Sequence, residues 1–209
     1  MERNWDKTLY PYELALKELK VKLRGIRGMY RLRNRPSPIE FVTGRLKPIE
    51  SIIDKAQRRH MSLDQLESEM EDIVGLRIMC PFVEDIYEVV DLIDQREDLT
   101  IIEERDYITH KKKSGYRSYH LICRYPVELV EGRRFVLVEI QVRTLAMNFW
   151  ASIEHSLHYK KDDQYYPEDI AERLQSVAES VFLLDEEMSQ LRQEIREIDA
   201  QHHLEEESR

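Results

Sequence analysis

The stretch Val136-Leu-Val-Glu-Ile-Gln-Val-Arg143 is the most informative in the chain, because its polarity alternates with a period of two residues. One face is entirely apolar, whereas the other carries Glu139, Gln141 and Arg143 in a row. Alternation of this kind indicates a β-strand that is buried on one side. An acid, an amide and a guanidinium on one rigid strand are typical of a functional site. The alternative is an edge strand with a solvated polar face.

The composition of the 209-residue chain indicates one soluble domain with long charged helices, since 35% of its residues are charged and 42% are hydrophobic. No stretch is apolar enough for a membrane span, and the first residues lack the apolar segment of a signal peptide. Cys80 and Cys123 lie in apolar runs, so we expect buried free thiols in a cytoplasmic protein. We predict a single domain over residues 1–199 and a frayed acidic tail over 200–209.

The net charge of −9 conceals a strong polarity along the chain. Residues 17–59 contain 13 basic and four acidic side chains, whereas residues 162–209 contain four basic and 15 acidic ones. A local basic field attracts phosphate-rich ligands whatever the net charge. The basic N-terminal third therefore favours a nucleotide or a nucleic acid as ligand.

Hydrophobic periodicity on both sides of the opening strand predicts the remaining elements. Helices are expected over 11–30, 48–60, 83–95, 145–160 and 167–198, and strands over 39–45, 73–80, 99–108, 118–125 and 135–143. This order predicts an α/β (α+β) fold in which helices cover a mixed sheet of about five strands. The two terminal helices carry more apolar stripe than one small sheet needs to bury, which favours a helical bundle or a subunit contact.

A second carboxylate is needed if Glu139 is to bind a metal, because Mg²⁺ usually binds one or two carboxylates together with substrate phosphates. Asp72 is the best candidate, since it directly precedes the apolar strand expected at 73–80. Gly75 would let a ligand approach the sheet closely, and Arg77 points to the same side. The alternative for Asp72 is a simple capping role.

A cluster of basic side chains accompanies the first predicted strand and the helix after it. Its members are Arg45, Lys47, Lys55, Arg58 and Arg59. They could clamp a polyphosphate while Arg45 or Arg77 stacks on a base. A solvated basic surface is the alternative.

The loop over residues 110–120 is a second basic segment, with three consecutive lysines at 111–113 followed by Gly115 and Tyr116. It favours a phosphate-binding loop with an aromatic plate for a base, and an ordinary exposed turn is the alternative. No segment fits the Walker pattern Gly-x4-Gly-Lys-Ser/Thr. Phosphates would therefore be held by side chains and a metal rather than by a glycine-rich backbone loop.

Three motifs together resemble the core of the RelA/SpoT-type alarmone synthetases. They are Glu71-Asp-Ile-Val-Gly-Leu-Arg77, Ser114-Gly-Tyr-Arg-Ser-Tyr-His120 and Val138-Glu-Ile-Gln-Val-Arg-Thr144, and Glu154-His-Ser-Leu-His-Tyr-Lys160 also matches. The run Pro38-Ile-Glu-Phe-Val-Thr-Gly-Arg-Leu-Lys-Pro48 is similar to the RelQ-type branch of small synthetases. The resemblance covers nearly the whole chain and implies a nucleotidyltransferase-like sheet.

The resemblance implies a Mg²⁺-dependent GTP pyrophosphokinase, which moves a pyrophosphoryl group from ATP to the 3′-hydroxyl of GDP or GTP and yields AMP and ppGpp or pppGpp. By this analogy Asp72 and Glu139 bind Mg²⁺, and Glu139 is also the base. The residues implied for ATP are Arg45, Lys47, Lys55, Arg58, Arg59 and Arg77. Those implied for GDP or GTP are Arg105, Lys112, Lys113, Tyr116 and His120. The implied supporting residues are Gln141, Arg143 and Glu154.

The RelQ-type branch further implies a homotetramer with a cleft that binds ppGpp or pppGpp as an activator. The matching positions are Lys20, Arg24, Arg27, Glu40, Phe41, Thr43 and Asn148. The first helix carries a basic stripe beside its apolar stripe. If the apolar stripe packs at a subunit interface, we expect the basic stripe to line that interface. Arg24 stands where relatives usually carry lysine, and a guanidinium is not equivalent to an ammonium.

Two other classes of function are alternatives. The basic N-terminal third and the tyrosine-bearing loop could bind single-stranded RNA, either as the sole role or beside the enzymatic one. A helical scaffold with a degenerate site is the other alternative. Such a scaffold would have no reason to keep Asp72 and Glu139 together.

Overall fold

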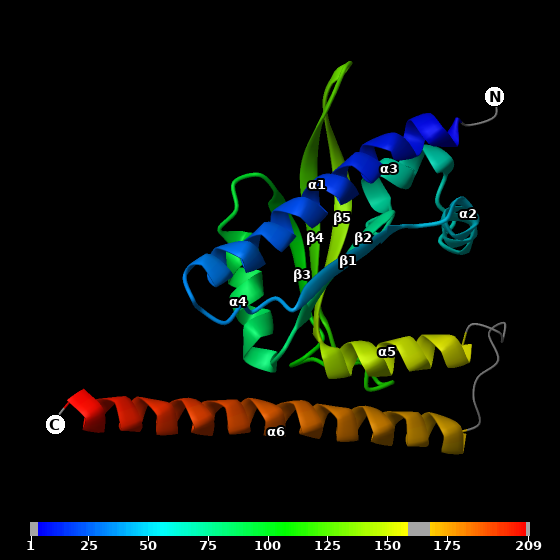
Figure 1. Ribbon diagram of the computed structural model, residues 1–209. Coiled ribbons are helices and arrows are strands. Elements are labelled where there is room, and N and C mark those ends of the chain that lie inside the picture. Colours follow the sequence, from blue (N-terminus) through cyan, green and yellow to red (C-terminus); the bar gives the residue numbers. More distant parts are fainter. Residues whose placement is uncertain (1–3, 159–167, 208–209) are drawn as a thin grey trace.

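The computed structural model describes residues 4–158 and 168–207, which form a five-stranded mixed sheet with the strand order β1-β2-β5-β4-β3 (Figure 1). β2 and β5 are parallel, and the other neighbouring pairs are antiparallel. The mixed sheet predicted from the sequence is thereby confirmed. The strands are β1 (Phe41–Leu46), β2 (Val74–Cys80), β3 (Thr100–Asp106), β4 (Tyr119–Leu129) and β5 (Gly132–Thr144).

The helices agree with the predicted ones except at some ends and in one short segment. They are α1 (Trp5–Leu32), α2 (Ile49–Arg58), α3 (Leu66–Glu69), α4 (Val83–Asp94), α5 (Leu145–His158) and α6 (Glu168–Glu207). α3 and the 3-10 turn η1 before it (Leu63–Gln65) were not predicted, because they are too short to show periodicity. The predicted helix end at residue 160 and start at residue 167 lie outside the described residues.

Both terminal helices are longer than predicted. α1 begins at Trp5 rather than near residue 11, because the Asn4 side chain caps it by accepting a hydrogen bond from the Lys7 backbone N–H (3.1 Å). α6 continues to Glu207, where the sequence suggested a frayed tail from residue 200. The tail residues are mostly good helix formers such as alanine, glutamine, leucine and glutamate, which accounts for the difference.

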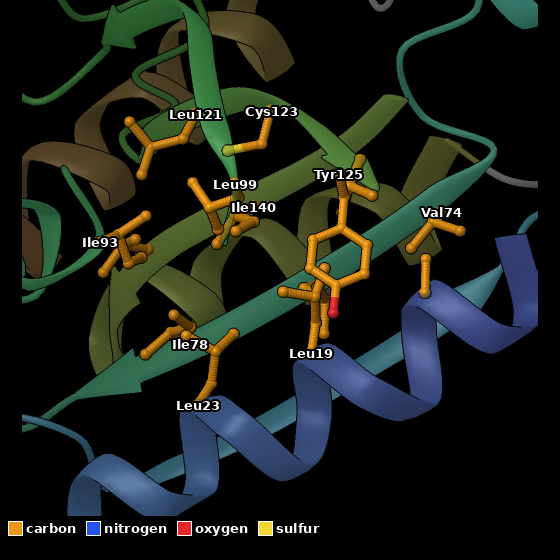
Figure 2. Close-up of a cluster of buried hydrophobic side chains, with 14 of the residues drawn as sticks. Leu19, Leu23, Val74, Ile78, Ile93, Leu99, Leu121, Cys123, Tyr125 and Ile140 are labelled. Atoms are coloured by element: carbon orange, nitrogen blue, oxygen red, sulfur yellow. The ribbon is translucent and has the colours of Figure 1, made fainter. Parts of the chain in front are cut away.

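The main hydrophobic core lies between the sheet and the helices α1 and α4 (Figure 2). Leu19 and Leu23 of α1 and Ile93 of α4 belong to the same buried cluster as Ile78 of β2 and Ile140 of β5. The apolar stripe of α1 therefore packs on the sheet of its own chain, which corrects the expectation that it packs at a subunit interface. The predicted buried free thiols, Cys80 and Cys123, are confirmed in this core.

The strand that opened the sequence argument, β5, lies between β2 and β4. The alternative of a solvated edge strand is therefore wrong. Its apolar residues Val136, Val138, Ile140 and Val142 are all buried. Its polar face consequently points to the opposite side of the sheet, away from the core beneath α1 and α4.

α6 differs from α1 because its apolar positions are largely exposed, with Leu184 56% and Ile195 57% accessible. Polar contacts hold its inner side instead. The Thr144 hydroxyl donates to Asp185 (2.5 Å), and Arg192 donates to Asp85 of α4 (2.7 Å). The exposed seam keeps a subunit contact as an expectation for this helix. Among the described residues, no helix combines the length and apolar character that crossing a membrane requires.

Candidate active site

The polar face of the sheet is built by two adjacent rows that the strand register places side by side. One row runs Arg45–Gly75–Glu139, and the next runs Thr43–Arg77–Gln141–His120–Arg105. Residues in one row project to the same face of a sheet. The fold thus brings onto one surface the candidates that the sequence distributes over five strands.

A cavity of about 320 Å³ opens above these rows. Its lining includes Asp72 and Glu139, the two carboxylates proposed from the sequence, together with Arg45 and Arg77. Gly75 contributes to its wall, and a side-chain carbon built there would meet no atom within 4 Å. The absent side chain at this position therefore leaves space for a ligand close to the sheet.

Asp72 lies in the turn before β2 and is paired with two lysines. Lys47 Nζ lies 2.8 Å from Asp72 Oδ2, and Lys55 Nζ of α2 lies 2.8 Å from Oδ1. Burial by itself would raise the pKa of this carboxyl group, but the two lysines outweigh it and hold the pKa below its usual range. Asp72 is therefore ionised and neutralised by two lysine ammonium groups.

Glu139 lies in the middle of β5 and accepts contacts from two neighbours. Gln141 Nε2 donates to Oε2 (2.8 Å), and His120 Nδ1 lies 3.1 Å from Oε1. Burial would raise the pKa of Glu139, but His120 and Gln141 together hold it below its usual range. Its side chain is 15% exposed, so an ionised carboxylate is held at the floor of the cavity.

A closed ring of side chains connects Glu139 to Tyr116. His120 Nε2 lies 2.8 Å from the Tyr116 hydroxyl, and Arg143 Nη2 donates to the same hydroxyl (2.5 Å). Arg143 also donates to Gln141 Oε1 (2.7 Å), which completes the ring through Gln141 to Glu139. Such a network fixes the orientation of each member. Gln141 and Arg143 are thus placed as supporting residues of the carboxylate.

Arginines separate this cavity from a second one of about 270 Å³. Arg45 and Arg77 line both cavities, and the second also reaches Tyr116, Arg143 and Glu154. Burial and the nearby guanidinium groups of Arg143 and Arg45 lower the pKa of Arg77. Like charges held so close favour the binding of an anion or of a flat, electron-rich ring.

Other candidates are placed less centrally. Arg58 pairs with Asp54 on the exposed side of α2 (2.7 Å), and Arg59 is an exposed residue at the end of that helix. Neither lines the two cavities described above. Arg105 donates to both oxygens of Glu71 (3.0 and 2.8 Å) and also to Glu103 (2.6 Å), which raises its pKa.

The loop between β3 and β4 comprises residues 107–118. We name it the acceptor loop, because the sequence resemblance implies that its side chains meet the acceptor nucleotide, GDP or GTP. Lys112 Nζ lies 5.0 Å from the ring centre of Tyr116 and 4.4 Å from that of Tyr107, while Lys113 is exposed. Sequence reasoning missed Tyr107, whose ring centre is also 5.2 Å from that of His120. It also missed Ser118, which accepts a hydrogen bond from Arg143 (3.1 Å). Ser118 lies within a quoted motif, but no spacing signal marks Tyr107.

Most of the predicted activator positions surround the edge strand β1. Arg24 of α1 donates to the backbone oxygen of Val42 (3.1 Å), and Arg27 lies 3.6 Å from Glu40. Phe41 is 40% exposed. Lys20 is half-buried on α1. Thr43 lines the first cavity, and Asn148 lies on α5. The amide oxygen of Asn148 is buried without a hydrogen bond.

Comparison with known families matches residues 44–164 to the region found in RelA and SpoT proteins. The chain therefore belongs to the RelA/SpoT family, and the resemblance drawn from its three motifs is confirmed. Within that family the similar proteins are small alarmone synthetases and GTP pyrophosphokinases.

Three comparisons show how far the similarity extends. The chain is 53% identical to the GTP pyrophosphokinase YjbM of Bacillus subtilis, over 95% of this chain and 93% of the relative. The structure of B. subtilis small alarmone synthetase 1 bound to its product pppGpp matches with a TM-score of 0.88 and 53% identity, covering 93% and 99% of the two chains. A GTP pyrophosphokinase family protein from Streptococcus pneumoniae matches with a TM-score of 0.88 and 54% identity, covering 95% and 97%.

Proposed function

We propose that this protein is a (p)ppGpp synthetase, which transfers a pyrophosphoryl group from ATP to the 3′-hydroxyl of GDP or GTP and releases AMP. One observation carries this proposal: two ionised carboxylates share a cavity walled by arginines, and one of them is paired with two lysines, in a chain 53% identical to a GTP pyrophosphokinase. In-line phosphoryl transfer needs positioning and charge neutralisation more than covalent chemistry. This arrangement supplies both.

On the donor side, the adenine of ATP binds between Arg45 and Arg77, which flank the first cavity. The triphosphate draws Lys47 and Lys55 away from Asp72, since both ammonium groups already pair with an anionic group that lines the cavity. Arg58 and Arg59 act only at the outer end of the phosphates, because they lie on the exposed part of α2.

Mg²⁺ fits the pair of carboxylates, although no group of three or more His, Cys, Asp or Glu side chains within the described residues forms a complete metal site. One buried oxygen, Asp72 Oδ1, has an ion pair with Lys55 but no hydrogen bond of normal geometry. Two carboxylates completed by substrate phosphates are the usual ligands of this ion. Asp72 and Glu139 would hold Mg²⁺, which neutralises phosphate charge when bound.

On the acceptor side, the guanine base stacks on Tyr116, and the lysines of the acceptor loop approach the phosphates. Glu139 removes the proton of the 3′-hydroxyl, for which its lowered pKa keeps it ionised. His120 and Gln141 orient this carboxylate through their contacts at 3.1 and 2.8 Å. Arg105, which is held by Glu71, steadies the segment next to Asp72.

Regulation by ppGpp or pppGpp is supported by the structure of β1. This strand carries Phe41 near the activator positions, and Thr43 and Arg45 in the first cavity. An anion that binds Arg24 and Arg27 would compete with their contacts to Val42 and Glu40 and so act on the same strand. The exposed apolar seam of α6 supports assembly into a homotetramer.

Single-stranded RNA is a second candidate ligand. The observation that favours it is the basic side of α1, where Arg24 and Arg31 are exposed beside half-buried Lys20 and Arg27. A groove of positive charge binds a nucleic-acid backbone without regard to sequence. RNA on this side would compete with the activator, because both ligands use the same cations.

The decisive experiment incubates the protein with ATP, Mg²⁺ and either GDP or GTP and separates the products by anion-exchange chromatography. We expect equal amounts of AMP and of ppGpp or pppGpp. Release of ADP and phosphate, or no consumption of ATP, would contradict the proposed reaction. Retained RNA binding together with that negative result would favour the RNA-binding role alone.

A further inference from the structure

The acceptor loop is attached to α6 as well as to the sheet, which it meets through the Tyr116 hydroxyl and Ser118. Between residues 111 and 117 its backbone hydrogen bonds are internal, from Gly115 N to Lys112 O (2.8 Å) and from Lys112 N to Tyr116 O (3.4 Å). Three residues of this segment contact α6. They are Lys111, Gly115 and Arg117, which surround Tyr116 in the sequence.

Arg117 makes the strongest of these contacts. Its side chain is only 5% exposed, and its guanidinium carbon lies 3.9 Å from the ring centre of Phe182 on α6. Nη2 donates to Glu179 Oε2 (3.1 Å), and Nη1 lies 3.4 Å from the backbone oxygen of Ala178. Because Glu179 is 43% exposed, solvent partly screens this pair, and its contribution is that of a partly exposed ion pair.

Lys111 and Gly115 of the loop also contact α6, at Glu179 and Ala178. Lys111 Nζ lies 2.8 Å from the same Glu179 oxygen that binds Arg117. A side-chain carbon built at Gly115, whose φ is +86°, would lie 2.4 Å from Ala178 Cβ. The loop and the helix are therefore in close contact on both sides of Tyr116.

Tyr116 itself packs between α5 and α6, against the small buried cluster of Trp150, Ala151 and Ala178. The two helices are tied together by a hydrogen bond from the Trp150 indole to the Leu174 backbone oxygen (3.3 Å). The aromatic ring is thus held by α5 and α6 at its face and by His120 and Arg143 of the sheet at its hydroxyl. A shift of α6 would move the surface on which the acceptor base stacks.

We propose that Arg117 and Glu179 are a positioning pair, which docks the acceptor loop on α6 and so sets the affinity for the acceptor nucleotide. The inference rests on the proposed function, because it takes GDP or GTP as the nucleotide that meets Tyr116. Neither residue touches the reacting atoms. Their effect is confined to the acceptor, since Asp72, Lys47 and Lys55 are held by separate contacts.

The test uses the full-length Glu179→Gln variant, which keeps the shape of the side chain and removes its charge. Glu187→Gln, at an exposed acid of the same helix, is the matched control. We expect the KM for GDP and GTP to rise about two- to fivefold in Glu179→Gln, with the KM for ATP and the Tm unchanged. Adding Phe182→Leu should raise the KM for the acceptor further.

A second readout does not depend on turnover. Trypsin cleaves after lysine, so its rate of cutting at residues 111–113 reports release of the loop. We expect faster cutting in Glu179→Gln than in wild type and in Glu187→Gln. Unchanged cutting with an unchanged acceptor KM would overturn the proposal, as would equal losses for both nucleotides with a lowered Tm. A wild type without synthetase activity would refute the proposed function, whereas the trypsin result would still test the docking.

Discussion

The two halves of the candidate active site are held in different ways. On the donor side, Arg45, Arg77 and Asp72 belong to β1, β2 and the turn before β2, which are joined by the hydrogen-bond ladder of the sheet. On the acceptor side, Tyr116 sits on a loop held by side-chain contacts. They come from His120 and Arg143 of the sheet and, through Arg117, from a helix 62 residues later in the chain. The donor half is thus part of the sheet, and the acceptor half is docked onto it through side chains.

This difference has a consequence for substitutions. The backbone hydrogen bonds of the sheet form as the protein folds, so the residues of the ATP side are in place once the sheet has formed. Side-chain contacts of the loop can be lost while the sheet stays intact, because local regions open at lower free energy than the whole domain. Changes in the acceptor half should therefore alter one substrate selectively, and Glu139, which serves both halves, should affect the whole reaction.

The largest expected effect is that of Glu139→Gln. The amide cannot accept the proton of the 3′-hydroxyl and is a poor ligand for Mg²⁺, so kcat should fall about a thousandfold or more. The far-UV circular dichroism spectrum should stay that of wild type. Glu128→Gln, an exposed acid on the neighbouring strand β4, is the control and should retain full activity. Near-normal turnover by folded Glu139→Gln would refute both roles of this carboxylate.

Tyr116→Ala should separate the two halves of the site. Stacking of a base on an aromatic ring contributes about 1–3 kcal/mol, so binding of GDP or GTP should weaken by about five- to 150-fold. ATP binding should change little, because the donor residues keep their own contacts. Titration of each nucleotide by calorimetry provides the measurement, with Tyr10→Ala on the exposed side of α1 as the control. If only ATP binding became weaker, Tyr116 would belong to the donor half of the site, and its assignment to the acceptor half would be wrong.

How much of this comparison could be predicted from sequence differs between the halves. Period-two alternation located β5, and apolar runs indicated the other strands. Asp72 was chosen as the partner of Glu139 because it directly precedes one of these apolar runs. The sequence could not indicate that His120 lies opposite Gln141 in the register, since strand order is a tertiary property. The helix that holds the acceptor loop was also missed, because the contact of Arg117 with Glu179 has no local pattern.

The amphipathic pattern was equally informative for α1 and α6, but its meaning differed. In α1 the apolar stripe fills the core of its own chain, with Leu19 and Leu23 fully buried. In α6 the same spacing leaves Leu184 and Ile195 exposed, since Ala178 and Asp185 face inward instead. Periodicity identifies which residues share a helix face, but tertiary packing decides what that face contacts.

An effect of similar size, on stimulation rather than on basal activity, is expected from changes at the activator positions. Arg24→Glu combined with Phe41→Ala should abolish stimulation by added pppGpp while leaving basal activity near that of wild type. Coupling between two sites typically amounts to about 1–3 kcal/mol, so the stimulation at stake is about five- to 150-fold. Initial rates measured against pppGpp concentration, together with the oligomer mass from light scattering, test this. A wild-type rate that does not change with added pppGpp, or a monomeric protein, would contradict the activator site. RNA binding would then be the remaining role for the basic side chains of α1.

The smallest expected effect concerns stability at acid pH. The pKa of Glu139 is lowered in the folded state, because the contacts with His120 and Gln141 outweigh burial. A group with a lowered folded pKa stabilises the protein fully above its unfolded pKa, which is usually near 4.5, and loses that contribution as the pH falls through the folded value. The free energy of unfolding should therefore drop more steeply below pH 5 in wild type than in Glu139→Gln, whose amide does not titrate. Urea titrations of both proteins at pH 6 and at steps below 5 measure this difference. Parallel curves would show that the carboxylate is not held by these partners, and the ring that links it to Tyr116 would then be absent in solution.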